Sequence, residues 1–185
     1  MTNMYNKAEA GRSMVEMLGV LAIVGVLSIG GISGYSKAMS KYKINKTLDQ
    51  VSLLVTNIRT TYGNQNSYMG LDSAALISYE LVDREMSRGA SASLKNPYNG
   101  EVNVTASTDG SSFTVTYAKL PKEACANIAS ANWGDSAASG LAGMKINEKE
   151  HTWSGTTDTD ALPISFSTAA GQCDTVENSI AWEYY

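Results

Sequence analysis

Few residues capable of acid–base or covalent catalysis occur in this 185-residue chain. It contains one histidine, His151, and two cysteines, Cys125 and Cys173, with no C-x-x-C pair. Serine–histidine–aspartate and cysteine–histidine sites both need a histidine base beside the nucleophile, so the sequence offers almost no candidate for either. His151, two residues before Trp153, is expected in a loop or on the surface. We therefore expect neither an enzyme nor a cofactor.

Metal ligands are equally sparse. Zinc sites use closely spaced cysteine and histidine pairs, which this chain lacks. Asp158 and Asp160 form a lone D-x-D without the further oxygen ligands of a calcium loop, so a solvated loop is expected there and no metal site. The aromatic residues of the C-terminal half are expected in the core or at subunit contacts rather than in a sugar-binding platform. These residues are Trp133, Trp153, Trp182, Tyr184 and Tyr185.

One carboxylate has unusual surroundings. Glu16 lies within an otherwise apolar run, residues 14–32, whose helical length of about 28 Å matches the hydrocarbon core of a bilayer. A carboxylate inside a membrane helix costs about 2.5 to 3.5 kcal/mol on insertion scales. We therefore expect Glu16 to have a partner of opposite charge.

The helical pattern continues beyond the apolar run. Residues from Ile44 to Tyr62 form one apolar stripe with spacings of four and three, the period of an amphipathic helix. No proline occurs before Pro97, and Gly63 is the first clear stop. The pattern predicts a single helix over residues 14–62, about 73 Å long. The stripe consists of Ile44, Leu48, Val51, Val55, Ile58 and Tyr62.

Gly11, Glu16 and the apolar run, in this register, resemble the N-terminus of type IV prepilins and pseudopilins. In that family a short polar leader ends in glycine, a peptidase cuts after it, and the fifth residue of the mature chain is glutamate. The resemblance implies a cut between Gly11 and Arg12, which makes Glu16 the fifth residue. It also implies that Glu16 pairs with the N-terminal amine, here on Arg12, of a neighbouring subunit. The family usually begins its mature chain with Phe, Met or Leu, and Arg12 departs from that pattern in a way that bears on N-methylation more than on cleavage.

A secretory signal peptide is the alternative interpretation. Lys7 and Arg12 precede an apolar core, and removal would then fall near Ser36, Lys37 and Ala38. An acidic residue at the head of the apolar region is unusual in signal peptides, and the helical pattern continues past the supposed cleavage point. Both observations favour the pilin-like interpretation.

Charge and cysteine content are consistent with export. The net charge is −4, and it stays −4 after removal of residues 1–11 because Lys7 and Glu9 cancel. A mildly acidic chain gives no support for nucleic-acid binding. An even number of cysteines in an exported chain predicts a disulfide between Cys125 and Cys173, with two unrelated buried thiols as the alternative.

The remaining residues predict a small α+β head with an antiparallel sheet. Residues 101–106 and 112–117 alternate polar and apolar side chains around Asp109-Gly110, which predicts a β-hairpin. A turn is expected at residues 96–100, and a β-prone strand at residues 179–185.

Three short helices are expected in the head. Asp72 or Ser73 is placed to cap the first, and Pro121 lies in the first turn of the second. Residues 167–173 form the third, which ends at Cys173. The second helix should present Ala124, Cys125, Ile128 and Ala129 on its inner face.

Three segments in this order are similar to type IVb pilins, which include bundle-forming pilin and the PilS-type conjugative pilins. The segments are residues 68–72, 96–101 and 120–125. The leader of 11 residues is shorter than type IVb leaders usually are.

The resulting expectation is a leader (1–11), an N-terminal helix (12–62, with a membrane and polymerisation half at about 14–34) and a disulfide-closed head (63–185). The resemblance implies a structural subunit of an extracellular bacterial pilus, inserted in the inner membrane as a prepilin and polymerised through its helix. Its partners would be further copies of itself, the prepilin peptidase, the inner-membrane assembly machinery and, before assembly, the membrane. A minor pilin, a secretion-system pseudopilin, and a bitopic or secreted binding protein that never polymerises are the alternatives.

Overall fold

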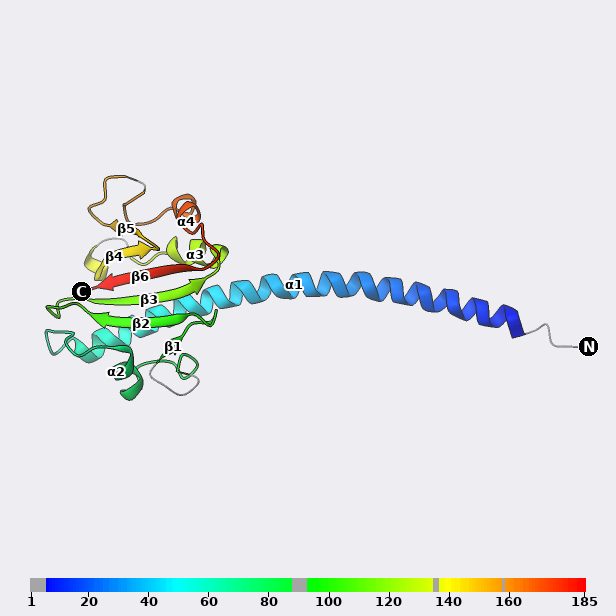
Figure 1. Ribbon diagram of the computed structural model, residues 1–185, viewed down its shortest axis with the longest axis horizontal. Coiled ribbons are helices and arrows are strands. Elements are labelled where there is room, and N and C mark those ends of the chain that lie inside the picture. The colour runs from blue at the N-terminus through cyan, green and yellow to red at the C-terminus, as the bar shows by residue number, and fades with distance from the viewer. Residues whose placement is uncertain (1–5, 88–92, 135–136, 158) are drawn as a thin grey trace, which may run out of the picture. The chain divides into compact units, whose positions relative to one another are not determined.

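The computed structural model describes residues 6–87, 93–134, 137–157 and 159–185, without the side chains of residues 6–13 and 137. The chain forms two compact units, Met1–Tyr42 and Lys43–Tyr185. Helix α1, Asn6–Tyr62, runs through both (Figure 1).

The long helix expected from the sequence is confirmed, including its end at Tyr62. The amide of Gly63 still donates to the carbonyl of Arg59 at 2.8 Å, after which Asn66 takes a left-handed conformation (φ 51°) and the chain turns. At its other end α1 begins at Asn6, inside the segment expected to be the leader, rather than near residue 14.

The second unit contains a six-stranded antiparallel sheet with the strand order β1-β2-β3-β6-β4-β5. Among the described residues, four helical segments besides α1 accompany it in the chain (Figure 1). The strands are β1 (Leu94–Lys95), β2 (Glu101–Ala106), β3 (Phe113–Leu120), β4 (Leu141–Ile146), β5 (Lys149–Thr152) and β6 (Asn178–Tyr184). The helices are α2 (Ser73–Ser78), α3 (Lys122–Ala129), the 3₁₀ turn η1 (Ala137–Ser139) and α4 (Phe166–Gln172).

The predicted hairpin is formed by β2 and β3, which pair from Val102 opposite Tyr117 to Ala106 opposite Phe113. Its turn is held by the carboxylate of Asp109, which accepts from the hydroxyl of Ser107 at 2.7 Å and the amide of Ser111 at 3.1 Å. These hydrogen bonds lower the pKa of Asp109 to about 2, because they favour the charged carboxylate.

The C-terminal strand β6 lies between β3 and β4, in the middle of the sheet. Trp182 on β6 is opposite Val115 on one side and Met144 on the other. The β-prone tail is therefore confirmed as a strand, and its central position means that β3 and β4 both depend on it for their hydrogen bonds.

The β4–β5 hairpin had no counterpart in the sequence analysis. A register shift between Leu141 and Gly143 makes Gly143 and Met144 consecutive buried residues, so β4 loses the alternation expected of a strand. The neighbouring strand β5 is the polar segment Lys-Glu-His-Thr, of which only His151 is buried.

The short helices are confirmed with one correction. Asp72 caps α2 by accepting from the amide of Ala75 at 2.7 Å, and Ser165 caps α4 through the amide of Thr168. Pro121 occupies the N-cap position of α3 in an extended conformation (φ −60°, ψ 153°), one residue before the helix rather than inside its first turn. Proline fits there because its fixed φ also suits an extended cap residue and no amide donor is required.

One hydrophobic core joins α1 to the sheet within the second unit. Val51, Leu54 and Ile58 of α1 are buried in the same cluster as Val115 and Trp182 of the sheet. At the end of the helix, rings contact one another in the order Tyr62, Tyr68, Phe113 and Tyr184, with centroids 4.7 to 6.1 Å apart. The last turns of α1 are thus part of the folded head.

Replacing Ile58 by alanine should destabilise the head by about 2 to 5 kcal/mol, because the fully buried side chain leaves a cavity in this core. Denaturant unfolding of the full chain in detergent, followed by tryptophan fluorescence, measures the loss. The matched control is Thr60→Ala on the exposed side of the same helix, with an expected change within about 0.5 kcal/mol. Equal stability of the two variants would show that α1 does not contribute to the core.

Candidate functional site

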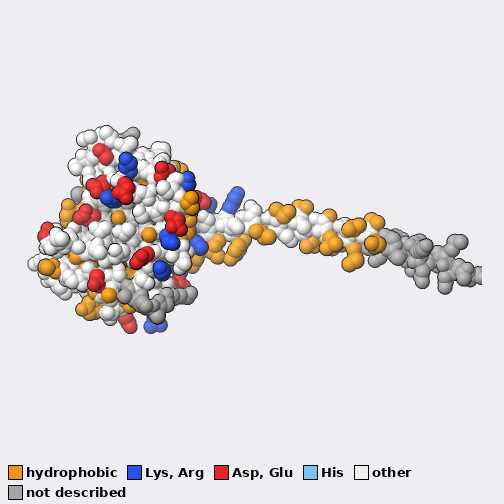
Figure 2. Space-filling view, viewed as in Figure 1, with side chains coloured by type: hydrophobic (Ala, Val, Ile, Leu, Met, Phe, Trp, Pro, Cys, Tyr) orange, Lys and Arg blue, Asp and Glu red, His pale blue; other side chains and the backbone are white. Residues whose placement is uncertain are grey.

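The first half of α1 exposes apolar side chains all around the helix. Between residues 14 and 32, twelve large apolar side chains have exposed fractions from 51% to 73%, and Figure 2 shows hydrophobic atoms along this stretch. Within the described part of the chain, this helix is long and apolar enough to cross a membrane. A continuous apolar surface of this size is unstable in water, so lipid or other helices must cover it. The side chains are Met14, Val15, Met17, Leu18, Val20, Leu21, Ile23, Val24, Val26, Leu27, Ile29 and Ile32.

Glu16 is an exposed carboxylate on this surface, flanked in the chain by Val15 and Met17. The predicted processing site lies close to it: the backbone of Gly11 and Arg12 belongs to α1, while the Arg12 side chain lies outside the described residues. Glu16 is the fifth residue after Gly11, about 7.5 Å further along a helix. Processing at Gly11 and pairing between subunits stay predictions.

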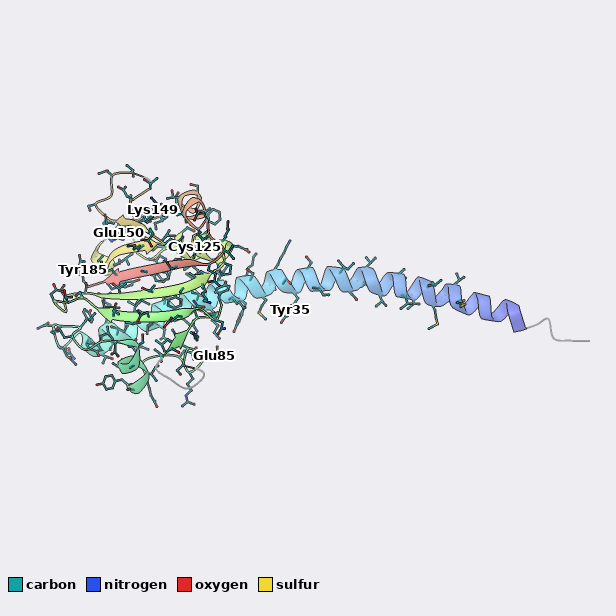
Figure 3. All side chains as sticks on the ribbon, in the orientation of Figure 1. Tyr35, Glu85, Cys125, Lys149, Glu150 and Tyr185 are labelled. Carbon is teal, nitrogen blue, oxygen red and sulfur yellow. A yellow bond between two sulfur atoms is a disulfide. The ribbon has the colours of Figure 1, made fainter. Side chains whose placement is uncertain are left out.

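The predicted disulfide is confirmed. Cys125 on α3 is bonded to Cys173, the C-cap residue of α4, with the two Cα atoms 5.9 Å apart and 48 residues apart in sequence. Both cysteines are buried in the core, and Figure 3 marks the position of Cys125. The bond ties the segment that leads into the central strand β6 to the middle of the head.

Two asparagines that the sequence analysis missed, Asn147 and Asn178, connect several segments of the head by hydrogen bonds. Asn178, almost fully buried at the start of β6, donates to the carbonyl of Leu120 at 3.1 Å and accepts from Asn147 at 3.0 Å. The same amide group of Asn147 also contacts the carbonyl of Gln172 at 3.0 Å. These bonds join β3, β6, the β4–β5 turn and α4, and only the sequence-distant pairing of these segments makes them possible.

His151 is not the surface or loop residue expected. It lies on β5 with 0% exposure, and its Nε2 is 2.7 Å from the side-chain oxygen of Gln172. The Gln172 amide nitrogen donates to the carbonyl of Thr159 at 3.1 Å, which turns the oxygen toward the ring, so Nε2 carries the proton and donates. The neighbours of His151 in the chain are polar and gave no sign of burial, because its hydrogen-bond partner Gln172 lies on α4, 21 residues further along the chain. His151 is a structural residue that joins β5 to α4.

The aromatic residues divide between core and surface. Trp182 is buried against Tyr117 and Trp133, with ring centroids 5.7 and 5.0 Å away. Trp133 and Trp153 are partly buried and donate their indole protons to backbone carbonyls, at 2.8 and 2.7 Å. Tyr184 is buried, and burial raises the pKa of its hydroxyl to about 12. Tyr185, by contrast, is 60% exposed. The expected core role therefore holds for the tryptophans and Tyr184, and Tyr185 is the one of the five on the surface.

The loop around Asp160 is stabilised by its own hydrogen bonds. The Asp160 carboxylate accepts from the hydroxyl and amide of Thr157, at 2.7 and 2.8 Å, and these bonds lower its pKa. Asp158 lies outside the described residues. The residues that the structure describes contain no group of three histidine, cysteine or acidic side chains able to hold a metal ion.

Comparisons with known proteins place the chain in a family. A family model described as "PilS N terminal" matches residues 41–183. The chain is 30% identical over 136 residues to the "Major structural subunit of bundle-forming pilus" of Escherichia coli O127:H6 (strain E2348/69 / EPEC), which covers 72% of this chain and 70% of that protein. The protein of the same description from Escherichia coli O111:H- matches equally well.

A solved structure of TcpA, a type IV pilin from Vibrio cholerae El Tor biotype, also resembles the fold. It has 11% identity and a TM-score of 0.49, and covers 78% of this chain and 99% of its own.

The family match and the bundle-forming pilus relatives show that this chain belongs to the type IV pilin family. Members of this family are structural subunits rather than enzymes. The family model matches residues 41–183, which do not include the N-terminal residues that carry the resemblance. It therefore confirms that resemblance from a different part of the chain.

Removing the disulfide should destabilise the head without affecting the N-terminal helix. Closing a loop of this length contributes about 4 kcal/mol in the chain-entropy model, so Cys173→Ser should lower the free energy of unfolding by about that amount. Unfolding of the full chain in detergent measures the change.

Reduction of the unmodified chain is the control for the substitution itself, since it opens the same loop without adding a buried hydroxyl. If reduction leaves the stability unchanged, the disulfide does not stabilise the head.

Proposed function

We propose that this chain is the major structural subunit of an extracellular type IVb pilus. It is made as an inner-membrane prepilin, cut by the prepilin peptidase after Gly11 and polymerised through its N-terminal helix by the inner-membrane assembly machinery. The observation that carries the proposal is a long helix with two different surfaces. Its first half is apolar on all sides, and its second half packs one face into a folded head.

The apolar half needs two successive environments in this proposal. Lipid covers it in the prepilin, because residues 14–32 match the thickness of the hydrocarbon core. In the filament, the equivalent helices of neighbouring subunits cover one another. A chain of this kind is stable in either environment and unstable in water between them, which favours direct transfer from membrane to filament.

Glu16 gives the assembly its register. Cleavage after Gly11 would create a new α-amine on Arg12, and that positive group on one subunit would pair with Glu16 on the next. Within a water-poor helix bundle, a charge pair that loses one partner is destabilised by about 3 to 5 kcal/mol. A docked subunit whose amine misses the carboxylate would bear that cost, so the correct axial position is selected.

The relatives favour a major subunit over the alternatives. The two Escherichia coli relatives named above are each described as a major structural subunit of the bundle-forming pilus. No feature of the described residues favours a minor pilin, a pseudopilin or a non-polymerising binding protein in particular. The abundance of the chain in recovered filaments distinguishes the major subunit from the first two, and the mature N-terminus distinguishes it from the last.

Processing after Gly11 predicts a mature chain of 174 residues, the 185 of the full chain minus the 11 of the leader. Intact-mass measurement and N-terminal sequencing of the exported protein should find Arg12 first. Gly11→Val should leave the uncut precursor in the membrane, because the bulkier side chain blocks the peptidase. The matched control is Ala10→Val, which should still be cut. A mature chain that begins near residue 39 would support the signal-peptide alternative instead.

Glu16→Val should give a processed subunit that fails to assemble. The substitution removes the cost of placing a carboxylate in the bilayer, so the membrane level should stay equal or rise. The Arg12 amine of the next subunit loses its counter-charge, so the yield of sheared surface filaments should fall by more than tenfold.

Ser28→Val is the control for Glu16→Val, because it also replaces a polar side chain by valine on the exposed surface of the same helix half. It should leave filament yield unchanged. A normal filament yield from the Glu16 variant, with the subunit present and cut, would remove the proposed role of this carboxylate.

A further inference from the structure

Four lysines follow the apolar run, and all lie within the ten residues 37–46: Lys37, Lys41, Lys43 and Lys46. No acidic residue occurs between Glu16 and Asp49, so this part of α1 is strongly positive. A cluster of this kind directly after a membrane-spanning stretch has the composition that attracts anionic lipid headgroups.

Two of the four lysines are accounted for by the head. The Nζ of Lys43 lies 5.5 Å from the ring centroid of Tyr98, and Lys46 forms an ion pair with Glu85. Lys37 and Lys41 are exposed, and neither has an ion pair or hydrogen bond to any residue that the structure describes. The contacts of the described residues therefore do not involve these two charges.

Two tyrosines alternate with them. Tyr35 is 66% and Tyr42 58% exposed, and Figure 3 shows the Tyr35 side chain on the outside of α1. At 100° per residue, Tyr35 and Tyr42 share one side of the helix, seven residues apart, and Lys37 and Lys41 share roughly the opposite side, four residues apart. We call these four residues the interfacial collar. Tyrosines and lysines are the side chains that anchor helix ends at the membrane–water interface.

Distances along the helix place the collar at one face of the bilayer. Tyr35 is 19 residues from Glu16, about 28 Å of helix, while the hydrocarbon core is about 30 Å thick. With Tyr35 at one interface, Glu16 reaches the other, where its insertion cost is lowest. Lys37 and Lys41 then lie about 3 and 9 Å beyond Tyr35, at the depth of the lipid phosphates.

The orientation required of a pilin makes these lysines unusual. Positive residues are normally concentrated on the cytoplasmic side of a membrane helix. Here the N-terminal side has Lys7 and Arg12, whereas the four lysines would stand on the far side with the head. An anionic partner on that side offsets this unfavourable distribution.

We propose that the interfacial collar binds the phosphate groups of anionic phospholipids in the leaflet on the head side of the membrane, before the subunit is extracted. This inference rests on the proposed function, since it requires a membrane-inserted prepilin with its head exported. Lys37 and Lys41 supply the charge, and Tyr35 and Tyr42 supply amphipathic rings at the same level.

Native mass spectrometry of the full-length chain in detergent tests the proposal, with phosphatidylglycerol and phosphatidylcholine as the two probes. The chain should bind phosphatidylglycerol in preference. In Lys37→Gln/Lys41→Gln, binding of phosphatidylglycerol should weaken about 30-fold, the equivalent of about 1 kcal/mol for each lysine, and binding of phosphatidylcholine should stay the same. Lys37→Arg/Lys41→Arg keeps the charge and should retain the preference.

The matched control is Lys122→Gln/Lys149→Gln, which removes two exposed lysines of the head and should not alter lipid binding. Equal weakening by the control, or no lipid preference in the unmodified chain, would overturn the proposal. A Lys37→Gln/Lys41→Gln variant that keeps its lipid preference but forms no filaments would also overturn it and would assign these lysines to contacts between subunits. Carbonate washing of cell membranes distinguishes a failure of the proposed function from a failure of this further proposal. A chain that washes off is not inserted in the membrane, which refutes the proposed function. A chain that is retained but has no lipid preference refutes only the proposed lipid binding by the interfacial collar.

Discussion

The apolar surface at the start of α1 is the constraint on which the rest of this protein depends. Twelve large side chains between residues 14 and 32 are more than half exposed, and the helix has no face on which they are covered. At roughly 25 cal/mol for each Å² of apolar area, the free energy of covering this surface greatly exceeds that of any single contact in the head. This part of the helix must therefore always have lipid or protein around it. A charged residue within it, such as Glu16, is an exception to its apolar composition and therefore needs a partner.

The last strand of the chain lies in the middle of the sheet of the head. β6 occupies the centre of the sheet, with β3 on one side and β4 on the other, although it is the final element in the chain. The Cys125–Cys173 bond and the bonds of Asn178 and Asn147 hold the segment that leads into β6 against α3 and the β4–β5 turn. A central strand at the end of the chain benefits from a covalent tether, because the tether reduces the conformational entropy that the chain loses when this strand is fixed in place.

The two halves of α1 illustrate how one regular helix can serve two purposes. From Ile44 to Tyr62 the apolar positions repeat with the helical period and are buried on one side, as in any amphipathic helix on a sheet. Before residue 33 the apolar positions have no such period, so no single side is distinguished. The change from an all-round apolar surface to a stripe occurs across residues 33–43, where the tyrosines and lysines are concentrated.

The sequence alone determined the features that arise from local periodicity and local chemistry. The end of α1 at Tyr62, the β2–β3 hairpin, the cap at Asp72 and the strand at the C-terminus all depend on residues close together in the chain, and the structure agrees with each. Glu16 could be singled out because an isolated charge in an apolar run is visible without any fold. The pairing of the cysteines followed from there being only two.

Tertiary structure decided the features whose partners lie far apart in the chain. The bulge in β4 and the polar sequence of β5 conceal the β4–β5 hairpin. β4 is stabilised by its pairing with β6 and β5 by its pairing with β4, and neither strand has an alternating pattern of its own. His151 was misplaced for the same reason: the oxygen of Gln172, 21 residues away, satisfies its proton and allows a polar ring to be buried. Periodicity reports which face of an element is apolar, but the burial of a polar side chain depends on a hydrogen-bond partner that only the folded chain brings to it.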